Sequence, residues 1–400
     1  MIDEIIATRA FGPMRVALRE DGQLMELLVE DAGEPGAVGD IIRGRVTAVM
    51  RGMEACFVDI GADKAGFLSF AARGGDDDDA APDDIPTEGA VVLVQVARVA
   101  QGGKGAGLTR SLSLPGRFLV LTPGRRRIAV SRRIEDEAAR ARLEDIVAGF
   151  LGDDEGFIVR TAAAAATAEA LEADAHALRA RWREITEGIG NGAVPARLHG
   201  EGGGLTRVLR DRAHGEIRRV IVDDARATDE ARAFFAEYLP GLERRVELWD
   251  GTEPVFEAFG VEDEIADALE PEVSLPCGGT VVIEHTHALT AIDVNTGRNT
   301  GRSNHATTVR ETNIEAAREI ARQLRLRGIG GLTVIDFVHM DHADDEDEVL
   351  DELLDALADD PAFIRTSGFS DLGLVELARR RGAGSLAERL AATPDDDAES

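Results

Sequence analysis

Two apolar segments that each run into an aspartate constrain the fold of this chain most. Residues 289–294 and 332–337 have the composition of β-strands, and residues 307–327 between them repeat apolar side chains with helical periodicity. A helix of this length connects two parallel strands of one sheet. Asp293 and Asp336 are therefore expected together at the rim of that sheet, where α/β proteins place their functional sites.

The residues around Asp293 indicate the kind of site. Side chains alternate along a strand, so Asn295 is expected on the same face as Asp293, with Ile292 and Val294 on the other. A single aspartate at a strand end more often caps loop backbone. Two carboxylates with a neighbouring carboxamide instead favour a hard divalent cation such as Mg²⁺, which takes one or two protein carboxylates and completes its shell with substrate phosphate.

The distribution of charge decides whether a polyanion is an acceptable partner. The formal net charge of −30 is unfavourable for nucleic acid when taken alone. Acidic residues are concentrated, without any Lys or Arg, in 76–84, 344–360 and 395–399. By contrast, 117–133 holds six Arg and no acid, and 296–335 holds seven Arg against three Glu. Because acid and base are segregated, the overall charge does not exclude a polyanionic partner.

Length and cysteine content limit the class of protein. A chain of 400 residues exceeds one ordinary core, so two or more domains are expected. Cys56 and Cys277 are the only cysteines, and they neither complete a four-ligand zinc site by themselves nor form a disulfide framework. No apolar run has the length of a membrane span and no leader-like segment is found, so we expect a cytoplasmic protein without a membrane span.

Smaller units are expected upstream of the two aspartates. Residues 1–30 have the pattern of a β-hairpin. Four short apolar runs with glycine turns between 41 and 117 indicate a small barrel or a sandwich. Helical patterns cover 135–151 and the alanine-rich 162–187, and a further helix is expected over 228–238.

Two amphipathic helices are expected in the C-terminal part of the chain. The helix over 307–327 carries apolar residues on one stripe and places Arg325 outside it. The acidic helix over 344–358 is expected to turn Leu354 toward the core together with its other leucines.

Long motifs in these segments carry a resemblance to a known family. The stretches "LTAIDVNTGR" and "TNIEAAREIARQLRLRGIGGLTVIDF" resemble the catalytic core of the ribonuclease E/G family of endoribonucleases. The similarity continues upstream through "LPCGGTVVIE" and "IRRVIVDD" to "RVALRE", and it reaches about residue 390. The chain is most similar to the short, ribonuclease G-like members that consist of the catalytic region.

The resemblance implies a multidomain α+β and α/β architecture. An RNase H-like domain contains an inserted S1 domain, which is an OB-fold β-barrel, and a 5′-sensor region, and a DNase I-like α/β catalytic domain follows. The implied boundaries are 1–35 with 206–268 for the RNase H-like domain, 36–117 for S1, 118–205 for the 5′-sensor region, 269–390 for the catalytic domain and 391–400 for a disordered acidic tail.

The resemblance also implies an activity and a cofactor. Carried over to this chain, Asp293 and Asp336 hold a catalytic Mg²⁺, and Asn295 positions the attacked phosphate. The implied reaction is metal-assisted attack of water on a phosphodiester of single-stranded RNA, which leaves a 5′-phosphate on the downstream product. The implied cellular role is RNA processing and decay.

The S1-like segment supplies candidate RNA contacts. Strand alternation places Cys56 and Val58 inside the barrel and Phe57 outside, and Phe67 offers a second stacking platform. A Phe in a small β-domain is more often a core residue. The family resemblance together with the alternation favours base stacking, and Lys104 is a candidate phosphate contact.

Two further sets of residues are implied by similarity. "GFIVRTAAAAA" resembles the pocket that recognises a 5′-monophosphate, with the Arg160 guanidinium and the Thr161 hydroxyl at the start of an alanine-rich helix whose free N–H groups favour an anion. The alternative for that pair is an ordinary helix start. Contacts with the RNA backbone are expected from Arg298, Arg302, Arg379 and Arg381.

The chain departs from the family pattern at several positions. The motif of two cysteines separated by two residues, which links subunits through zinc, is missing, so we expect no structural zinc and a homodimer or other homo-oligomer without that link. His339 stands where another Asp is usual, His287 where Glu is common, and the loop 299–311 lacks its usual acidic pair.

Three functions therefore compete at the level of sequence. The leading hypothesis is a Mg²⁺-dependent endoribonuclease that prefers single strands with a 5′-monophosphate. A catalytically weak RNA-binding regulator with the same fold is the alternative, and the intact Asp293, Asn295 and Asp336 speak against it. A phosphodiesterase of small nucleotides would not need Phe57 and Phe67.

Overall fold

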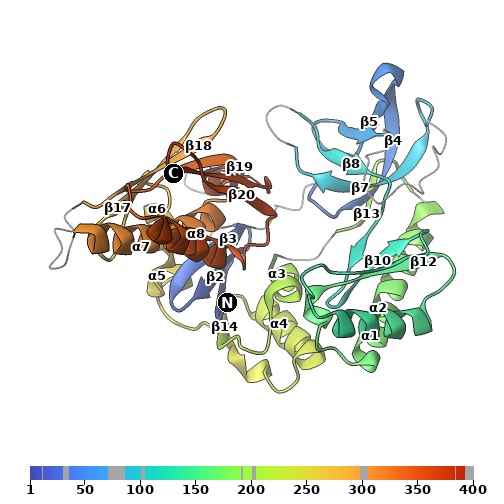
Figure 1. Cartoon of the computed structure of the whole chain (residues 1–400). Helices are drawn as coiled ribbons and strands as arrows, with labels where there is room; N and C mark the ends of the chain where they lie inside the picture. The colour runs from blue at the N-terminus through green and yellow to red at the C-terminus, as the bar shows by residue number, and fades with distance from the viewer. Residues whose placement is uncertain are drawn as a thin grey trace, which may run out of the picture. The chain divides into compact units, whose positions relative to one another are not determined.

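The computed structural model divides the chain into two compact units, one of residues 1–30 with 215–400 and one of residues 31–214 (Figure 1). The structure describes residues 1–10, 12–29, 36–70, 86–100, 104–190, 192–200, 204–297, 305–382 and 384–391. Within these residues, no helix is both long and apolar enough to cross a bilayer. The units are described separately below.

The first unit begins with a five-stranded sheet in the order β15-β14-β1-β2-β3. Its strands are β1 (Glu4–Thr8), β2 (Arg15–Glu20), β3 (Gln23–Val29), β14 (Arg219–Val222) and β15 (Val246–Leu248). The antiparallel pairing of β2 with β3 confirms the hairpin predicted within residues 1–30. Because β1 pairs in parallel with β14, the start of the chain is joined to the segment that follows the other unit.

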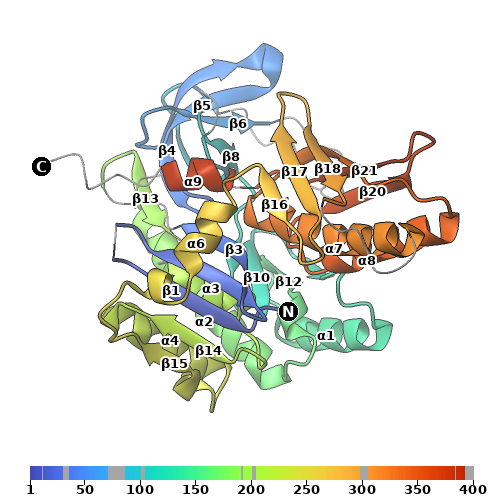
Figure 2. The same ribbon diagram turned by 90° about the vertical axis from the view of Figure 1, so that its left-hand side faces the viewer.

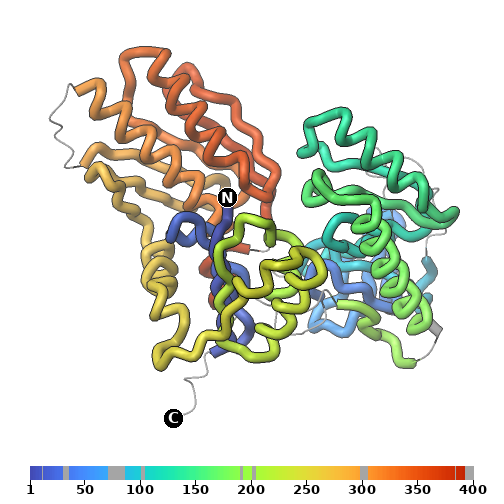
Figure 3. The backbone as a smooth tube through the Cα atoms, turned by 90° about the horizontal axis from the view of Figure 1, so that it is seen from below, coloured from blue at the N-terminus to red at the C-terminus, as the bar shows by residue number. Residues whose placement is uncertain are grey.

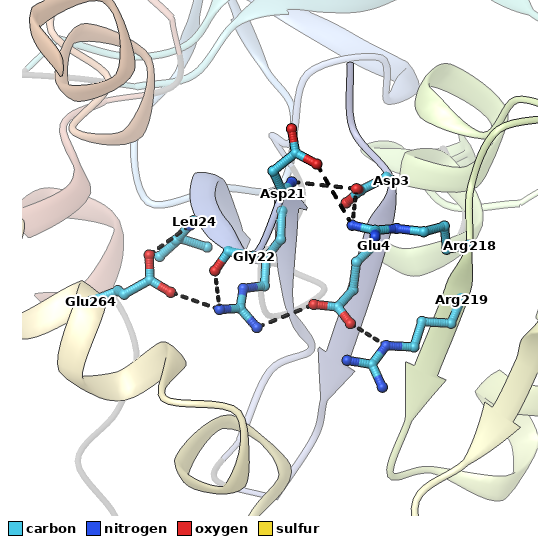
Figure 4. Close-up of polar contacts among 9 residues, drawn as sticks. Asp3, Glu4, Asp21, Gly22, Leu24, Arg218, Arg219 and Glu264 are labelled. Atoms are coloured by element: carbon cyan, nitrogen blue, oxygen red, sulfur yellow. Dashed lines mark hydrogen bonds and ion pairs between the residues drawn. The ribbon is translucent and has the colours of Figure 1, made fainter. Parts of the chain in front are cut away.

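Buried ion pairs hold this sheet together (Figure 4). Glu4 on β1 is 5% exposed and accepts hydrogen bonds from Arg19 on β2, at 3.1 Å, and from Arg219 on β14. Arg19 also donates to Glu264, at 3.1 Å, and the second Glu264 oxygen accepts from the Leu24 N–H at 2.6 Å. The buried Glu4 and the partly buried Glu264 therefore each have a guanidinium partner.

The helices of this half of the unit follow β14. They are α4 (Ala225–Tyr238), α5 (Val255–Ala258) and α6 (Val261–Asp267), and α6 carries Glu264. The helix expected over 228–238 is confirmed, although it begins three residues earlier, where the Asp224 side chain accepts from the Ala227 N–H at 2.7 Å.

The second sheet of this unit has six strands in the order β16-β17-β18-β19-β21-β20. They are β16 (Glu272–Ser274), β17 (Thr280–His285), β18 (Thr290–Asn295), β19 (Gly331–Asp336), β20 (Ile364–Phe369) and β21 (Leu374–Arg379). Helix α7 (His305–Leu326) connects β18 to β19, which pair in parallel. The predicted strand–helix–strand crossover is therefore confirmed.

Helices α7 and α8 (Ala343–Leu357) pack together and cover one face of this sheet (Figure 2). A buried core forms between them, with Ile292 and Ile335 from the strands, Ile320 from α7 and Leu353 from α8. The short helix α9 (Leu386–Ala391) packs near β3, where Leu386 joins the core of the five-stranded sheet.

Two predicted helix faces need correction. Arg325 on α7 was expected outside the apolar stripe, but it is 7% exposed and its Nε donates to Glu26 on β3 at 3.2 Å. The reason is that α7 is covered on a second side by the N-terminal hairpin. Leu354 on α8 was expected inward and is 41% exposed, because the buried stripe of α8 is formed by Val349, Leu353 and Leu357.

The second unit contains a closed barrel. Its strands are β4 (Ile41–Met50), β5 (Ala55–Asp59), β6 (Gly66–Ser69), β7 (Val91–Arg98) and β8 (Gly107–Thr109). The order β4-β5-β6-β8-β7 closes through pairing of β4 with β7, and β13 (Ala196–His199) adds beside β4. Of the two predicted alternatives, barrel or sandwich, the barrel is confirmed, which is consistent with an S1 or OB-type domain.

A four-stranded sheet in the order β11-β12-β10-β9 completes this unit. Its strands are β9 (Leu114–Pro115), β10 (Leu119–Pro123), β11 (Ile128–Val130) and β12 (Glu155–Val159). Helices α1 (Glu137–Phe150) and α2 (Ala168–Glu187) lie against this sheet (Figure 3). Phe157 of β12 is fully buried in the core that they share with the sheet. Helix α3 (Gly204–Arg212) is the last element of this unit along the chain.

Candidate active site

The two strand-end carboxylates meet as predicted. In β18, Ile292 and Val294 are buried, whereas Asp293 and Asn295 are exposed, so the predicted alternation is confirmed. Asp293 is the register partner of Asp336 on the parallel strand β19. Neighbouring strands lie about 4.8 Å apart and partners in register point to the same face. The two carboxylates are therefore adjacent at the rim of the sheet.

Asn295 completes a small polar cluster with Asp293. Its Nδ2 donates a hydrogen bond to the Asp293 Oδ2 at 2.6 Å. Because an ionised carboxylate only accepts hydrogen bonds, this contact orients the amide nitrogen toward Asp293. The carboxamide is therefore held on the face that Asp293 and Asp336 share.

The adjacent negative charges of Asp293 and Asp336 favour a bound cation. Among the residues that the structure describes, no Arg or Lys forms an ion pair with Asp293 or Asp336. Two like charges on adjacent strands repel each other unless a cation lies between them. The described residues also contain no group of three His, Cys, Asp or Glu side chains arranged around a metal position. A set of two carboxylates fits Mg²⁺, which keeps several waters and takes substrate phosphate as a further ligand.

A glycine turn supports the end of β18. Any side chain on Gly279 would approach the Asn295 carbonyl oxygen to 2.7 Å, and one on Gly297, which has a φ of +53°, would collide with the Gly278 carbonyl oxygen. Only glycine allows these segments to pack so closely. The "CGGT" stretch therefore fixes the strand end that bears Asp293, a role that the sequence reasoning did not assign.

His339 and His287, the two histidines that differ from the family pattern, do not belong to the carboxylate pair in this structure. His339 lies three residues beyond Asp336, and its side chain is 86% exposed with Asp341 at 3.9 Å. His287 lies in the turn between β17 and β18, at the opposite end of β18 from Asp293. Residues 299–304 of the altered loop 299–311 lie outside the described residues, and so do Arg298 and Arg302, whereas residues 305–311 belong to α7.

The predicted aromatic residues lie side by side on the barrel surface. Phe57 on β5 is the register partner of Phe67 on β6, and their ring centroids are 5.9 Å apart in an edge-to-face arrangement. Both rings are half-buried, whereas Cys56 and Val58 are fully buried inside the barrel. Lys104 is exposed on the segment that leads into β8, whose Gly107 pairs with Phe67.

The Arg160 guanidinium is held in place by neighbours on two elements. It donates to the Gly116 carbonyl at 2.6 Å and forms an ion pair with Asp211 on α3, also at 2.6 Å. Burial opposes ionisation of Asp211, but hydrogen bonds and charge from Arg210 and then Arg160 outweigh it and lower the pKa of this carboxyl below its usual value. Asp211 therefore occupies Arg160 as an internal anion.

The alanine-rich helix expected over 162–187, directly after Arg160 and Thr161, starts later. Thr161 begins a 3₁₀ turn, and its hydroxyl lies 3.0 Å from the Ser131 hydroxyl. Helix α2 begins only at Ala168, where Thr167 caps it by accepting from the Ala170 N–H at 3.3 Å. Because Thr167 is the better N-cap, the free N–H groups of α2 are not located at Arg160 and Thr161.

The expectation for Arg379 is wrong, and that for Arg381 stays a prediction. Arg379 is 7% exposed, forms a two-pronged ion pair with Asp360 at 2.8 and 3.0 Å, and donates to the Ile329 carbonyl at 2.9 Å. Alternation along β21 turns this side chain inward, so it is not available to RNA. Arg381 is exposed and lies against Gly330 and Gly331.

The fold and the site together define a mixed α/β protein with several sheets, a five-stranded barrel and an acidic strand-end site suited to a divalent cation. Comparison with known proteins identifies its relatives. The pattern of the ribonuclease E/G family matches residues 113–382. Ribonuclease G of Escherichia coli (strain K12) is 39% identical over 397 residues, which cover 96% of this chain and 81% of that protein.

Two further relatives agree with this match. Ribonuclease G of Haemophilus influenzae is 38% identical over 93% of this chain and 78% of that protein. Ribonuclease E of Escherichia coli (strain K12) is 36% identical over 94% of this chain and 36% of that protein. The chain belongs to the ribonuclease E/G family.

Proposed function

We propose that this protein is a Mg²⁺-dependent endoribonuclease that cleaves single-stranded RNA by attack of water and leaves 5′-phosphate products. The observation that carries the proposal is the register pairing of Asp293 with Asp336, with Asn295 hydrogen-bonded beside them. The names of the relatives, ribonuclease G and ribonuclease E, support the reaction class. The proposed role is RNA processing and decay.

Each residue of the site has its own role in the proposed reaction. Asp293 and Asp336 would hold the ion from two adjacent strands. Bound Mg²⁺ supplies charge neutralisation at the phosphate and a coordinated water of lowered pKa. Asn295 presents its amide on the same face, where it can donate to a non-bridging phosphate oxygen and fix the attacked group.

The barrel surface supports the proposed preference for single strands. Unpaired bases expose faces that stack on aromatic rings, and the Phe57–Phe67 pair offers two rings next to each other. Lys104 supplies a positive charge for the backbone, and Arg381, Arg298 and Arg302 are proposed to do the same in the other unit. A preference for small nucleotides would leave this aromatic pair without a role.

Recognition of a 5′-monophosphate is proposed for Arg160 and Thr161. A terminal phosphate would take the guanidinium hydrogen bond that Asp211 holds at 2.6 Å. The preference for a 5′-monophosphate over a 5′-hydroxyl is therefore set by a competition between two anions for Arg160. The segments 36–117, 118–205, 269–390 and 1–35 with 206–268 are proposed as the S1, 5′-sensor, DNase I-like and RNase H-like regions, in a homo-oligomer without a zinc link.

A cleavage assay tests the function. The protein is incubated with a 5′-monophosphorylated, single-stranded oligoribonucleotide in Mg²⁺, beside Asp293→Asn and the matched variant Asp341→Asn, which changes an exposed carboxylate outside the pair. We expect cleavage by the unmodified protein and by Asp341→Asn, and a loss of at least about a thousandfold, equivalent to ~4 kcal/mol, for Asp293→Asn.

Each other result has a defined meaning. Binding of the oligonucleotide without cleavage by the unmodified protein would favour the RNA-binding regulator instead of the enzyme. Equal cleavage by Asp293→Asn would point to a contaminating nuclease or to a different site. Cleavage that is indifferent to removal of the 5′-phosphate would refute the role of Arg160 and Thr161 and leave the endoribonuclease proposal standing.

A further inference from the structure

One fully buried amide connects the crossover helix to the segment that carries Asp336. Asn313 on α7 has no exposed surface. Its Nδ2 donates to the Val338 carbonyl at 2.8 Å, and its Oδ1 accepts from the Val338 N–H at 3.1 Å. The side chain therefore pairs with both peptide groups of one residue, as a neighbouring strand would.

The position of Val338 explains why this pairing matters. In the described residues, the ladder of β19 ends at Asp336, which pairs with Asp293 on one side and Leu374 on the other. Val338 lies two residues further on, where strand pairing has stopped. Backbone polar groups that are shielded from water need partners, and the amide of Asn313 supplies them for the partly buried Val338. Asn313 thus extends the ordered part of β19 beyond its carboxylate.

The same stretch of α7 also supports the end of β18. Glu315 accepts from the Cys277 N–H at 2.8 Å, and Thr312, which is fully buried, packs against the glycine turn beneath Asn295. A side chain on Gly279 would lie 2.9 Å from the Thr312 methyl group and 2.7 Å from the Asn295 carbonyl. Three neighbouring positions of one helix therefore contact the supports of both carboxylates.

The choice of residue argues against a role in packing alone. Asn is a poor helix former in a helix interior, and burying an amide is unfavourable unless both of its polar atoms are paired. An aliphatic residue would be the ordinary choice for the buried face of α7, where Ala316, Ala317 and Ile320 lie. The Asn313 amide lies where the helix passes Val338, and both of its polar atoms are paired there.

We propose that Asn313 is a positioning residue for the metal pair. It holds Val338 and thereby sets the Asp336 carboxylate at a constant distance from Asp293. The inference rests on the proposed function, because it assigns Asn313 a role in holding the ion that Asp293 and Asp336 would bind. Partners of this kind behind metal ligands typically change metal affinity by 10- to 100-fold when they are removed.

The test measures metal binding and stability side by side. Binding of Mn²⁺, as a paramagnetic probe for Mg²⁺, is followed by electron paramagnetic resonance in the whole protein, and thermal unfolding by circular dichroism. The variants are Asn313→Leu, Asp293→Asn to define the site-specific binding, and Gln323→Leu as the matched control. Gln323 is also a buried amide of α7, 2% exposed, but it contacts Glu319 and Arg327.

We expect Asn313→Leu to bind Mn²⁺ at least tenfold more weakly, while Gln323→Leu keeps the affinity of the unmodified protein. Cleavage by Asn313→Leu should recover at saturating Mg²⁺, since the ligands themselves are present. Asn313→Ala, in which a water has room to satisfy Val338, is the second variant if the leucine variant does not fold, and we expect a smaller loss.

Unchanged Mn²⁺ affinity in a folded Asn313 variant would overturn the inference and leave the proposed function intact. An equal loss in Gln323→Leu would also overturn it, because the effect would then be general destabilisation. If Asp293→Asn binds Mn²⁺ as the unmodified protein does, the metal pair itself is wrong and both proposals fall.

Discussion

Carboxylates at two places in the same unit of this protein differ in whether Arg side chains neutralise them. At the start of β1, Glu4 is buried and is paired with Arg19 and Arg219. At the ends of β18 and β19, Asp293 and Asp336 are exposed, adjacent and without an ion-pair partner among the described residues. Glu4 is neutralised by Arg side chains, whereas no cation in the described part of the chain neutralises Asp293 and Asp336.

The difference separates charges that hold the fold from charges kept for a ligand. A buried carboxylate without a partner is strongly destabilising, so Glu4 requires its guanidinium groups. An exposed pair at a strand end contributes little to stability, and its mutual repulsion is relieved when a cation binds. An exposed carboxylate pair with no cationic partner among the described residues therefore points to a ligand site.

The largest expected effect on stability concerns the buried carboxylate of Glu4. Replacing Glu4 by Gln removes the carboxylate that Arg19 and Arg219 share, so that Arg19 keeps Glu264 as its ion-pair partner. We expect the free energy of unfolding to fall by about 3 kcal/mol. Asp336→Asn should leave the free energy of unfolding unchanged, because its side chain is exposed and the change removes a like-charge contact. Urea titration at neutral pH and low Mg²⁺ measures both.

The reverse order of effects would contradict the distinction. A stability loss in Asp336→Asn larger than in Glu4→Gln would mean that the strand-end pair is part of the structural framework. Asp341→Asn, another exposed carboxylate of the same region, serves as the control and should be neutral.

The same difference between buried and accessible side chains is found among the aromatic residues. The effect expected there, on RNA affinity, is intermediate in size. Phe57 leaves part of its ring exposed beside Phe67, whereas Phe157 is completely buried. We expect Phe57→Ala to weaken the affinity for a single-stranded oligoribonucleotide by about 1–3 kcal/mol, which is roughly 5- to 150-fold, because stacking is lost.

Fluorescence anisotropy in the Asp293→Asn background measures this affinity without cleavage. Phe57→Tyr retains the ring and is expected to bind as the unmodified protein does. An alanine variant that binds equally well would show that the ring belongs to the barrel core and not to the RNA surface.

The smallest expected effect concerns His199, whose imidazole the fold favours in its neutral form. Burial first, and then the charges of Arg181, Arg197 and Arg210, lower the pKa of His199 from 6.5 to about 4. Between these values the unfolded chain binds a proton that the folded chain does not, so stability is highest above pH 6.5 and falls as the pH approaches 4. Because His199 is partly exposed, we expect a loss on the order of 1 kcal/mol between pH 7 and pH 5.

Urea titrations at the two pH values test this titration. His199→Gln should reduce the pH dependence by that amount, whereas His176→Gln, which changes an exposed histidine on α2, should leave it unchanged. A pH dependence that is identical in the His199 variant and the unmodified protein would show that His199 titrates alike in both states.

Much of the architecture was predictable because it is written in local periodicity. The hairpin of residues 1–30, the crossover through α7 and the alternation around Asp293 all follow from which residues are apolar at spacings of two or 3.6. The strand pattern by itself predicts the barrel only as one of two alternatives, since a barrel and a sandwich use the same short strands and differ in whether β4 meets β7. The family resemblance is what favours the barrel.

The wrong predictions concern residues whose partners are far away in the chain. Arg325 is buried because Glu26, about three hundred residues earlier, lies on a strand that packs against α7. Arg379 is buried because Asp360 reaches it from the loop before β20. The start of α2 was misplaced because an alanine-rich run contains no signal that distinguishes a 3₁₀ turn from the first turn of a helix, apart from the capping Thr167.

The sequence alone determined that this chain carries two strand-end aspartates joined by one helix, and its long motifs placed it in its family. The tertiary structure decided which charges are neutralised and which stay available, because ion pairs and buried hydrogen bonds form between segments that only folding brings together. Asn313 illustrates this: in sequence it is a polar residue within a helix, and its contact with Val338 makes it a support for Asp336.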